Sequence, residues 1–398
     1  MTEVVIGRQE ILDAQLGIYA YELLFRGKDF DLATKEGASG ATAQIITDTL
    51  LEVGLNAVVG DCKAFVNFTA QNLREKIPLY LPKDRVVVEV LEDVAVDLRI
   101  INNLKEIKAA GYTLALDDFE MHQEWEPLLE LADIVKLDVL ARPVEDTLEM
   151  ISKLKKYDLM LLAEKVETNE MFEVFRDAGC ELFQGFFFNK PKTVAGRRLG
   201  INQLAAIKLL TKVNDPDVSF PELATIISQD AGLSFKLLRY INSAFFGLPN
   251  KIDSLPHAVS YLGLNEVRRW VNILTLASLS GKPGAQFQQA LVRGKMCELI
   301  AKSCGEPSGN LFLIGMLSCI DAILDISLED ALAQIPVGTA TVGAILHHEG
   351  VAGSILADVI SYEQWKMTDA NFHNSNLYDL GRFYLESIGW AGGILGQL

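Results

Sequence analysis

The chain has few cysteines and few histidines for its length, with five of each among 398 residues. No two cysteines stand in a C-x-x-C spacing, which disfavours zinc motifs, thioredoxin-type motifs and a disulfide framework. No apolar stretch approaches the ~20 residues of a membrane span. No basic and then apolar leader opens the chain, so we expect a cytoplasmic protein without a secretory signal or a membrane span.

Basic residues are scarce relative to acidic ones. The 36 Lys and Arg against 53 Asp and Glu give a net charge of −17, which disfavours long nucleic acids and anionic lipid as partners. A small anionic ligand is not excluded, because bound metal ions reverse the local field. The charge is uneven, with −14 on residues 1–195 and −3 on residues 196–398. This asymmetry predicts two units with different roles.

The pattern of strands and helices changes at the same place. In the first half, β-rich runs at 4–7, 18–24, 64–68, 86–90, 113–116, 134–137, 159–163 and 182–187 alternate with amphipathic segments at 41–53, 98–109, 144–156 and 169–178. This alternation predicts an α/β domain, a (β/α)8-type barrel, over residues 1–195. The second half contains helical segments between Gly and Pro breakers, at 202–213, 221–229, 233–241, 266–279, 286–304 and 328–335. It predicts an all-α domain over residues 196–398.

Polar side chains stand at or near the ends of seven of the expected strands. They are Glu22, Asn67, Glu89, Asp117 with Asp118, Lys136 with Asp138, Glu164 and Gln184. The C-terminal ends of barrel strands carry the reacting groups, so we expect these side chains to converge. Carboxylate and amide oxygens without histidine favour Mg²⁺ or Mn²⁺. Two adjacent aspartates can serve two metal ions, a common device for attack of water on a phosphodiester.

The first half resembles the EAL-domain family of cyclic-di-GMP phosphodiesterases and their degenerate relatives. The resemblance covers about residues 3–195 and rests on an ordered series of short motifs. These are E-L-L-F-R at 22–26, V-N-F-T at 66–69, E-V-L-E at 89–92, D-D-F at 117–119, K-L-D at 136–138, A-E-K-V-E at 163–167, Q-G-F at 184–186 and K-P at 190–191.

The resemblance implies a role for each matching residue. A first metal ion, Mg²⁺ or Mn²⁺, would be held by Glu22, Asn67, Glu89 and Asp117, and a second by Asp117 and Asp118. Glu164 would be the general base, Lys136 would lie beside the attacking water, and Arg26 would bind a ligand phosphate. Supporting places fall to Glu92, Asp138, Glu167 and Gln184. The implied reaction opens cyclic di-GMP to linear pGpG.

The sequence also departs from the family pattern. Hydrolysing members continue D-D-F-G-T-G, whereas residues 119–126 contain neither glycine, Leu23 replaces the alanine of E-A-L, and Lys165 replaces the glycine of A-E-G-V-E. Lys165 would either lower the basicity of Glu164 or point outward. The complete acidic set favours hydrolysis, and the altered loop favours an inactive receptor or interaction scaffold, so both stay open. Barrels of this family often pair near that loop, and a homodimer also stays open.

The second half resembles HDOD domains, helical relatives of HD phosphohydrolases, over about residues 197–398. The match is strongest at N-S-A-F-F, residues 242–246, and at the helix 258–263. It implies a signalling module without hydrolase activity that contacts a protein partner. No histidine precedes an aspartate, as an HD site requires. His347 and His348 would point about 100° apart on a helix and do not converge on one ion, so we expect a polar helix end there.

Overall fold

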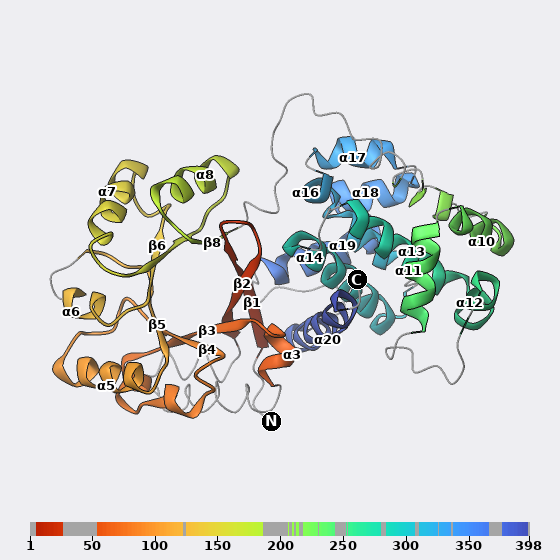
Figure 1. Cartoon of the computed structure of the whole chain (residues 1–398). Helices are drawn as coiled ribbons and strands as arrows, with labels where there is room; N and C mark the ends of the chain where they lie inside the picture. The colour runs from red at the N-terminus through yellow and green to blue at the C-terminus, as the bar shows by residue number, and fades with distance from the viewer. Residues whose placement is uncertain are drawn as a thin grey trace. The chain divides into compact units, whose positions relative to one another are not determined.

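The computed structural model describes residues 5–26, 54–121, 125–185 and 206–396, the last range with gaps at 207–208, 211, 215–217, 230, 243–251, 253, 280–283, 307–309, 325, 336 and 366–375. The chain divides into two compact units, residues 1–188 and 189–398 (Figure 1). The expected boundary at 195/196 lies outside the described residues and stays a prediction, as does the expected helix 41–53.

Eight strands close into a barrel in the first unit, in the order β1 to β8. They are β1 Val5–Asp13, β2 Ile18–Arg26, β3 Lys63–Phe68, β4 Val86–Val90, β5 Thr113–Leu116, β6 Ile134–Asp138, β7 Met160–Glu164 and β8 Leu182–Gln184. Neighbours from β2 to β8 are parallel, and β1 is antiparallel to both β2 and β8. The expected α/β barrel is confirmed.

The barrel differs from a regular (β/α)8 arrangement in its first connection, which is a hairpin turn instead of a helix. Asp13 Oδ1 accepts hydrogen bonds from the backbone N–H groups of Gln15 and Gly17, both at 2.8 Å. An aspartate that binds the backbone shortly after it stabilises a tight turn. Strands joined by so short a segment must run antiparallel, because a parallel connection needs a dozen or more residues.

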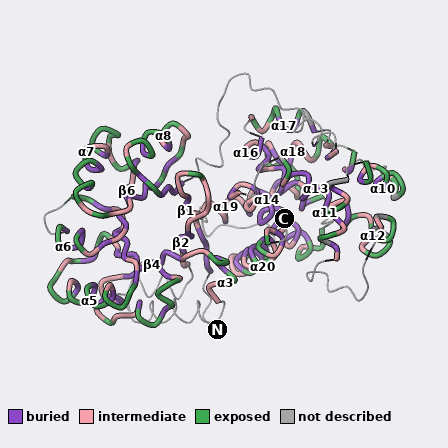
Figure 2. Tube along the Cα trace, viewed as in Figure 1, coloured by how far each residue is buried: buried purple, intermediate pink, exposed green. Residues whose placement is uncertain are grey.

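Helices lie outside the ring of strands (Figure 1). They are α3 Leu55–Val59, α4 Ala70–Arg74, α5 Leu98–Ala109, α6 Glu126–Leu129, α7 Val144–Leu154 and α8 Asn169–Ala178, with the 3-10 helix η1 at Ile77–Tyr80. Asp97 caps α5 by accepting from the Ile100 N–H, and Thr168 caps α8 by accepting from the Met171 N–H. These caps fix the helix starts that follow β4 and β7. The strands are mostly buried, and the outer helices expose one face (Figure 2).

One apolar side chain from each strand packs into a single core cluster of the barrel. The cluster consists of Ile11, Ala20, Phe65, Val87, Ala115, Ile134, Leu162 and Leu182, none more than 2% exposed. Side chains two positions apart on a strand point to the same face. The next position on that face therefore lies one step nearer the C-terminal end of β2 to β8, and this apolar layer forms the floor beneath it.

The described part of the second unit consists of helices. They are α10 Phe220–Ser228, α11 Ala231–Ile241, α12 Leu255–Leu262, α13 Leu264–Leu279, α14 Ala285–Ser303, α15 Leu311–Leu317, α16 Ile320–Leu324, α17 Leu328–Gln334, α18 Thr339–His347, α19 Gly350–Glu363 and α20 Leu377–Leu395. The central α14 packs against α15, α19 and α20. A Cβ on Gly315 of α15 would lie 2.7 Å from the Gly294 Cα of α14, so only glycine permits this crossing. Among the described residues, no helix combines the length and apolarity needed to cross a membrane.

Two buried charged residues of the helical unit, Arg293 and Glu298, have partners of opposite sign. Arg293 Nη2 lies 2.7 Å from Glu363 Oε2. Glu298, whose side chain is 1% exposed, contacts Arg269 Nη2 at 2.9 Å, Lys295 Nζ at 3.3 Å and Lys302 Nζ at 2.5 Å. Burial raises the pKa of Glu298, but the hydrogen bond from Lys302 and the charges of Arg269 and Lys295 outweigh it. The net result is a pKa below the usual value.

Candidate functional site

A layer of polar side chains lies directly above the apolar floor of the barrel. On the parallel strands each follows its apolar neighbour by two positions, in the order Glu22, Asn67, Glu89, Asp117, Lys136, Glu164 and Gln184. Because β1 runs the opposite way, its equivalent is Gln9, two positions before Ile11, and Gln9 lies opposite Glu22 in the β1–β2 ladder. Seven predicted side chains thus share one end of one barrel.

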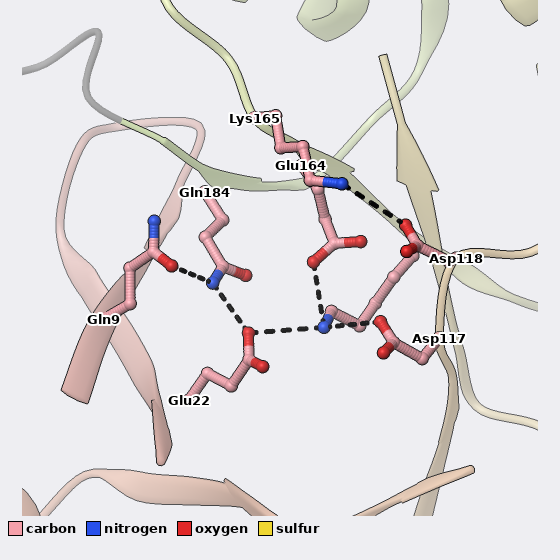
Figure 3. Close-up of a pocket in the computed structure, with 8 residues that line it drawn as sticks. Gln9, Glu22, Asp117, Asp118, Glu164, Lys165 and Gln184 are labelled. Carbon is pink, nitrogen blue, oxygen red and sulfur yellow. Dashed lines mark hydrogen bonds and ion pairs between the residues drawn. The ribbon is translucent and has the colours of Figure 1, made fainter. Parts of the chain in front are cut away.

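A pocket with a volume of about 200 Å³ opens at this end of the barrel (Figure 3). Its lining consists of Gln9, Glu22, Asp117, Asp118, Lys136, Glu164, Lys165 and Gln184. Pockets that enclose a drug-sized ligand measure roughly 300–1,000 Å³. The volume enclosed by the described residues lies below that range.

Lys136 is the centre of this layer, and its side chain is only 1% exposed. Its Nζ lies 3.3 Å from Glu22 Oε2, 2.8 Å from Asp117 Oδ1 and 2.9 Å from Glu164 Oε1, and it also contacts Glu89 Oε1. Burial lowers the pKa of Lys136, but the surrounding carboxylates outweigh burial and hold it well above the usual value. One ammonium cannot neutralise four carboxylates, so negative charge remains uncompensated.

Two carboxyl groups of this layer, those of Glu89 and Glu164, have raised pKa values. Burial and the nearby Glu22 and Asp117 raise the pKa of Glu89 well above its usual value, with Lys136 opposing them. Burial raises the pKa of Glu164 to about 7, again opposed by Lys136 and helped by Asp117 and Glu22. A carboxyl group that exchanges its proton near neutral pH has the property that a general base needs.

Several buried oxygen atoms of the layer have no hydrogen-bond partner among the described residues. They are Asn67 Oδ1, Glu89 Oε2, Asp118 Oδ1 and Gln184 Oε1. The amide nitrogens are already engaged, since Asn67 Nδ2 donates to Glu22 at 3.2 Å and Gln184 Nε2 donates to Glu22 at 2.7 Å and to Gln9 at 2.9 Å. Unpaired buried acceptors are costly, and a cation satisfies them without a hydrogen bond.

A second group of oxygen atoms lies beside the first. Asp117, Asp118 and Glu164 each place one carboxylate oxygen within 4.8 Å of the other two. Burial and the charge of Asp117 raise the pKa of Asp118, with Lys165 opposing them. An all-oxygen donor set of carboxylates and an amide fits a hard divalent cation of the Mg²⁺ or Mn²⁺ kind.

Lys165 reaches across the pocket rim to Asp118, which follows β5, and to Asp138, the last residue of β6. Its Nζ lies 2.5 Å from Asp138 Oδ2. It also lies 3.9 Å from Asp118 Oδ1, the contact drawn in Figure 3. The other oxygen of Asp138 accepts backbone N–H bonds from Leu140 at 2.8 Å and Ala141 at 3.1 Å. Burial raises the pKa of Asp138, but the bond from Lys165 and these backbone bonds outweigh burial and lower it. From the sequence, Lys165 was expected either to lower the basicity of Glu164 or to point outward. Its main partner in the structure is Asp138, which that expectation did not include.

Some predicted site residues do not reach the pocket. Glu92 and Glu167 are exposed and are not part of its described lining, and Asn67, Glu89 and Asp138 also lie outside that lining. The side chain of Arg26, the last residue of β2, is outside the described part of the structure, so its contact with a phosphate stays a prediction. Conversely, sequence reasoning missed Gln9. Gln9 and Ile11 are two positions apart, so their side chains lie on the same face of a strand. That Gln9 lies toward the site follows only from the antiparallel direction of β1.

The fold and the site together define the class of protein, a β/α barrel with an acidic, lysine-centred pocket at its strand ends, joined to a helical unit. The EAL domain family model matches residues 64–191, from β3 onward, and the HDOD domain family model matches residues 203–361. A protein of Vibrio cholerae, named cyclic di-GMP phosphodiesterase CdgJ, is 33% identical over 89% of this chain and 84% of its own length. This chain belongs to the family of proteins that join an EAL domain to an HDOD domain.

The comparisons also found a second similar protein and a solved structure. The protein YuxH of Bacillus subtilis, described as uncharacterized, is 29% identical and covers 98% of this chain and 99% of its own length. A solved structure titled PaMucR phosphodiesterase, c-di-GMP complex, is 22% identical and covers 51% of this chain and 99% of its own, with a TM-score of 0.40.

Proposed function

We propose that the barrel binds cyclic di-GMP together with a divalent cation and hydrolyses the dinucleotide to linear pGpG. The observation that carries the proposal is the ring of four carboxylates around Lys136, with oxygens on Asn67 and Glu89 that have no hydrogen-bond partner in the described part of the chain. The Vibrio cholerae relative, named as a cyclic di-GMP phosphodiesterase, supports the choice of substrate.

A divalent cation would be held by Glu22, Asn67, Glu89 and Asp117, and Asp118 offers a further oxygen beside them. When bound, it supplies positive charge for the phosphate oxygens and lowers the pKa of water. Mg²⁺ and Mn²⁺ both suit this donor set. With that charge in place, the acidic pocket accepts a doubly anionic dinucleotide.

Glu164 is the general base of the proposed reaction. Lys136 engages its Oε1 at 2.9 Å, which holds the carboxylate in place and leaves its second oxygen for a water proton. Water attacks the phosphorus, the bond from phosphorus to the 3′-oxygen breaks, and Glu164 takes the water proton. The released 3′-oxygen takes a proton from solvent, and the product keeps the phosphate at its 5′ end.

Turnover of cyclic di-GMP by the full chain tests this proposal. We expect pGpG in the presence of Mn²⁺ or Mg²⁺, none after chelation, and a rate about 10²–10⁴-fold lower for Glu164→Gln, the usual contribution of a general base. Glu173→Gln is the matched control, because Glu173 is an exposed residue of α8 and outside the described pocket lining. If Glu164→Gln and the wild type hydrolyse at the same rate, Glu164 is not the base.

The second candidate function is a receptor or scaffold that binds cyclic di-GMP without hydrolysing it. The ion pair of Lys165 with Asp138, close to Asp118, favours it, because a fixed cation stands beside a carboxylate that a metal ion would use. Binding by calorimetry with no pGpG formed would support this receptor and contradict hydrolysis. We also propose that the HDOD domain binds a protein partner and that the chain forms a homodimer. Light scattering of the full chain tests the homodimer.

A further inference from the structure

The pocket contains two lysines in different roles. Lys136 is buried among four carboxylates and belongs to the polar layer of the site. Lys165 is half exposed, with 52% of its side chain accessible, and stands at the rim beside Asp118 and Asp138. The hydrolytic site proposed above uses Lys136 and gives Lys165 no task.

The position of Lys165 is fixed by specific contacts. Its ammonium lies 2.5 Å from Asp138 Oδ2, and Leu140 and Ala141 hold the other oxygen of that carboxylate through their backbone N–H groups. Both oxygens of Asp138 are therefore occupied by donors from the protein. The same ammonium lies 3.9 Å from Asp118 Oδ1, a buried oxygen with no hydrogen-bond partner among the described residues.

The backbone at this point is strained for a lysine. Lys165 has a φ of 58°, in the left-handed region, and Asp118 opposite it has a φ of 37°. Aspartate adopts this region several-fold more readily than most residues. Lysine has no such preference and bears the steric cost of the left-handed region, which glycine avoids. The backbone on either side of Lys165 is held by hydrogen bonds, since Glu164 O accepts from Val139 N–H at 3.3 Å and Val166 N–H donates to Gln184 O at 3.0 Å.

We propose that the Lys165 ammonium takes the place of a second divalent cation beside Asp118 and Asp138, so that the barrel binds one such ion per chain. A cation bound through Asp118 Oδ1 would share that oxygen with a positive charge already 3.9 Å away. Repulsion between like charges weakens such binding strongly in a partly buried site. The inference rests on the proposed divalent-cation site and does not depend on turnover.

Counting bound Mn²⁺ on the full chain tests the inference without reference to activity. The electron paramagnetic resonance signal of free Mn²⁺ is titrated with protein in about 0.15 M salt, where exposed acidic groups are screened. The wild type is compared with Lys165→Met, which removes the charge, with Lys165→Gly, which also removes the strain, and with Lys165→Arg, which keeps the charge. Lys153→Met is the matched control, because Lys153 is an exposed lysine of α7 paired with Glu149 and outside the pocket.

We expect one tightly bound Mn²⁺ in the wild type, Lys165→Arg and Lys153→Met, and a second ion, bound at least tenfold more tightly than in the wild type, in Lys165→Met and Lys165→Gly. The same count of one or of two in all five proteins overturns the role of Lys165 and leaves the proposed cation site standing. No bound Mn²⁺ in any of them overturns both. A second ion in Lys165→Gly but not in Lys165→Met would assign the effect to strain and contradict a role for the charge.

Discussion

The two units treat buried charge in opposite ways. In the helical unit, Arg293 has one carboxylate, that of Glu363, and Glu298 has three cations around it. In the barrel, one buried lysine faces four carboxylates, and acceptor oxygens beside it stay unpaired among the described residues. Burying charge costs free energy unless it is compensated. In the helical unit, Arg293 and Glu298 have partners of opposite charge within the protein, and Oε1 of the carboxylate paired with Arg293 lacks a hydrogen-bond partner among the described residues. In the barrel, carboxylates outnumber the lysine, and the proposed cation would supply the missing positive charge.

Replacing the central lysine should break this contrast most strongly. Without metal, we expect Lys136→Met to lower the free energy of unfolding of the barrel by about 3 kcal/mol, the lower end of the loss for breaking a buried ion pair, because the carboxyl groups can take up protons. Millimolar Mn²⁺ should restore most of the loss, since a cation bound to the folded state stabilises it. Urea unfolding with and without Mn²⁺ measures both effects.

Arg293→Met is the partner experiment in the helical unit. It leaves the carboxylate of Glu363, whose side chain is 8% exposed, without its arginine. A loss of about 3–5 kcal/mol is expected, and Mn²⁺ should not restore it. Rescue of both variants by Mn²⁺, or of neither, would remove the distinction between the two units.

An effect of intermediate size is expected for the pH dependence of stability in the helical unit. The pKa of Glu298 is lowered in the folded state, so its contribution to stability is present above its ordinary value of 4.5 and is lost as the pH falls through the lowered folded value. We expect Glu298→Gln to cost about 2 kcal/mol at pH 7, as for a hydrogen bond to a charged group. The difference from wild type should shrink toward pH 3 in urea unfolding. Glu386→Gln, at an exposed position of α20, should show no such difference, and a pH-independent cost for Glu298→Gln would contradict the charge pairing.

The smallest expected effect concerns the one polar side chain that β1 adds to the layer. Gln9 accepts a hydrogen bond from Gln184 at 2.9 Å, and Gln184 in turn donates to Glu22 at 2.7 Å. Gln9→Ala should cost about 1 kcal/mol of stability, the net value of a hydrogen bond. It should weaken Mn²⁺ binding by about tenfold, as loss of a residue behind a ligand does. The exposed Gln15 in the same hairpin provides the control, since Gln15→Ala should change neither quantity.

Several helices of both units could be predicted from the sequence because the signals for a helix lie within its own segment. The helices expected at 98–109 and 169–178 have the bounds of α5 and α8, since caps and apolar periodicity lie within each segment. The expected helix 144–156 continues two residues beyond Leu154, where α7 ends. The His347–His348 pair stands where α18 ends, as expected of a polar helix end.

The sequence by itself determined which side chains of one strand share a face. Ala20 and Glu22, or Leu162 and Glu164, are two positions apart, and the period of a strand is two. It also determined the chemistry of the layer, because the donor types are written in the chain. The comparison with relatives then confirmed the family that these ordered motifs indicate.

Only the tertiary structure decided which of these polar residues meet. Closure of the barrel brings Lys136 against Glu22, 114 positions away, and the antiparallel direction of β1 adds Gln9 to the layer. It also leaves Glu92 and Glu167 exposed and turns Lys165 toward Asp138. The physical reason is that strand periodicity is a local property, whereas the order and direction of strands depend on contacts between distant parts of the chain.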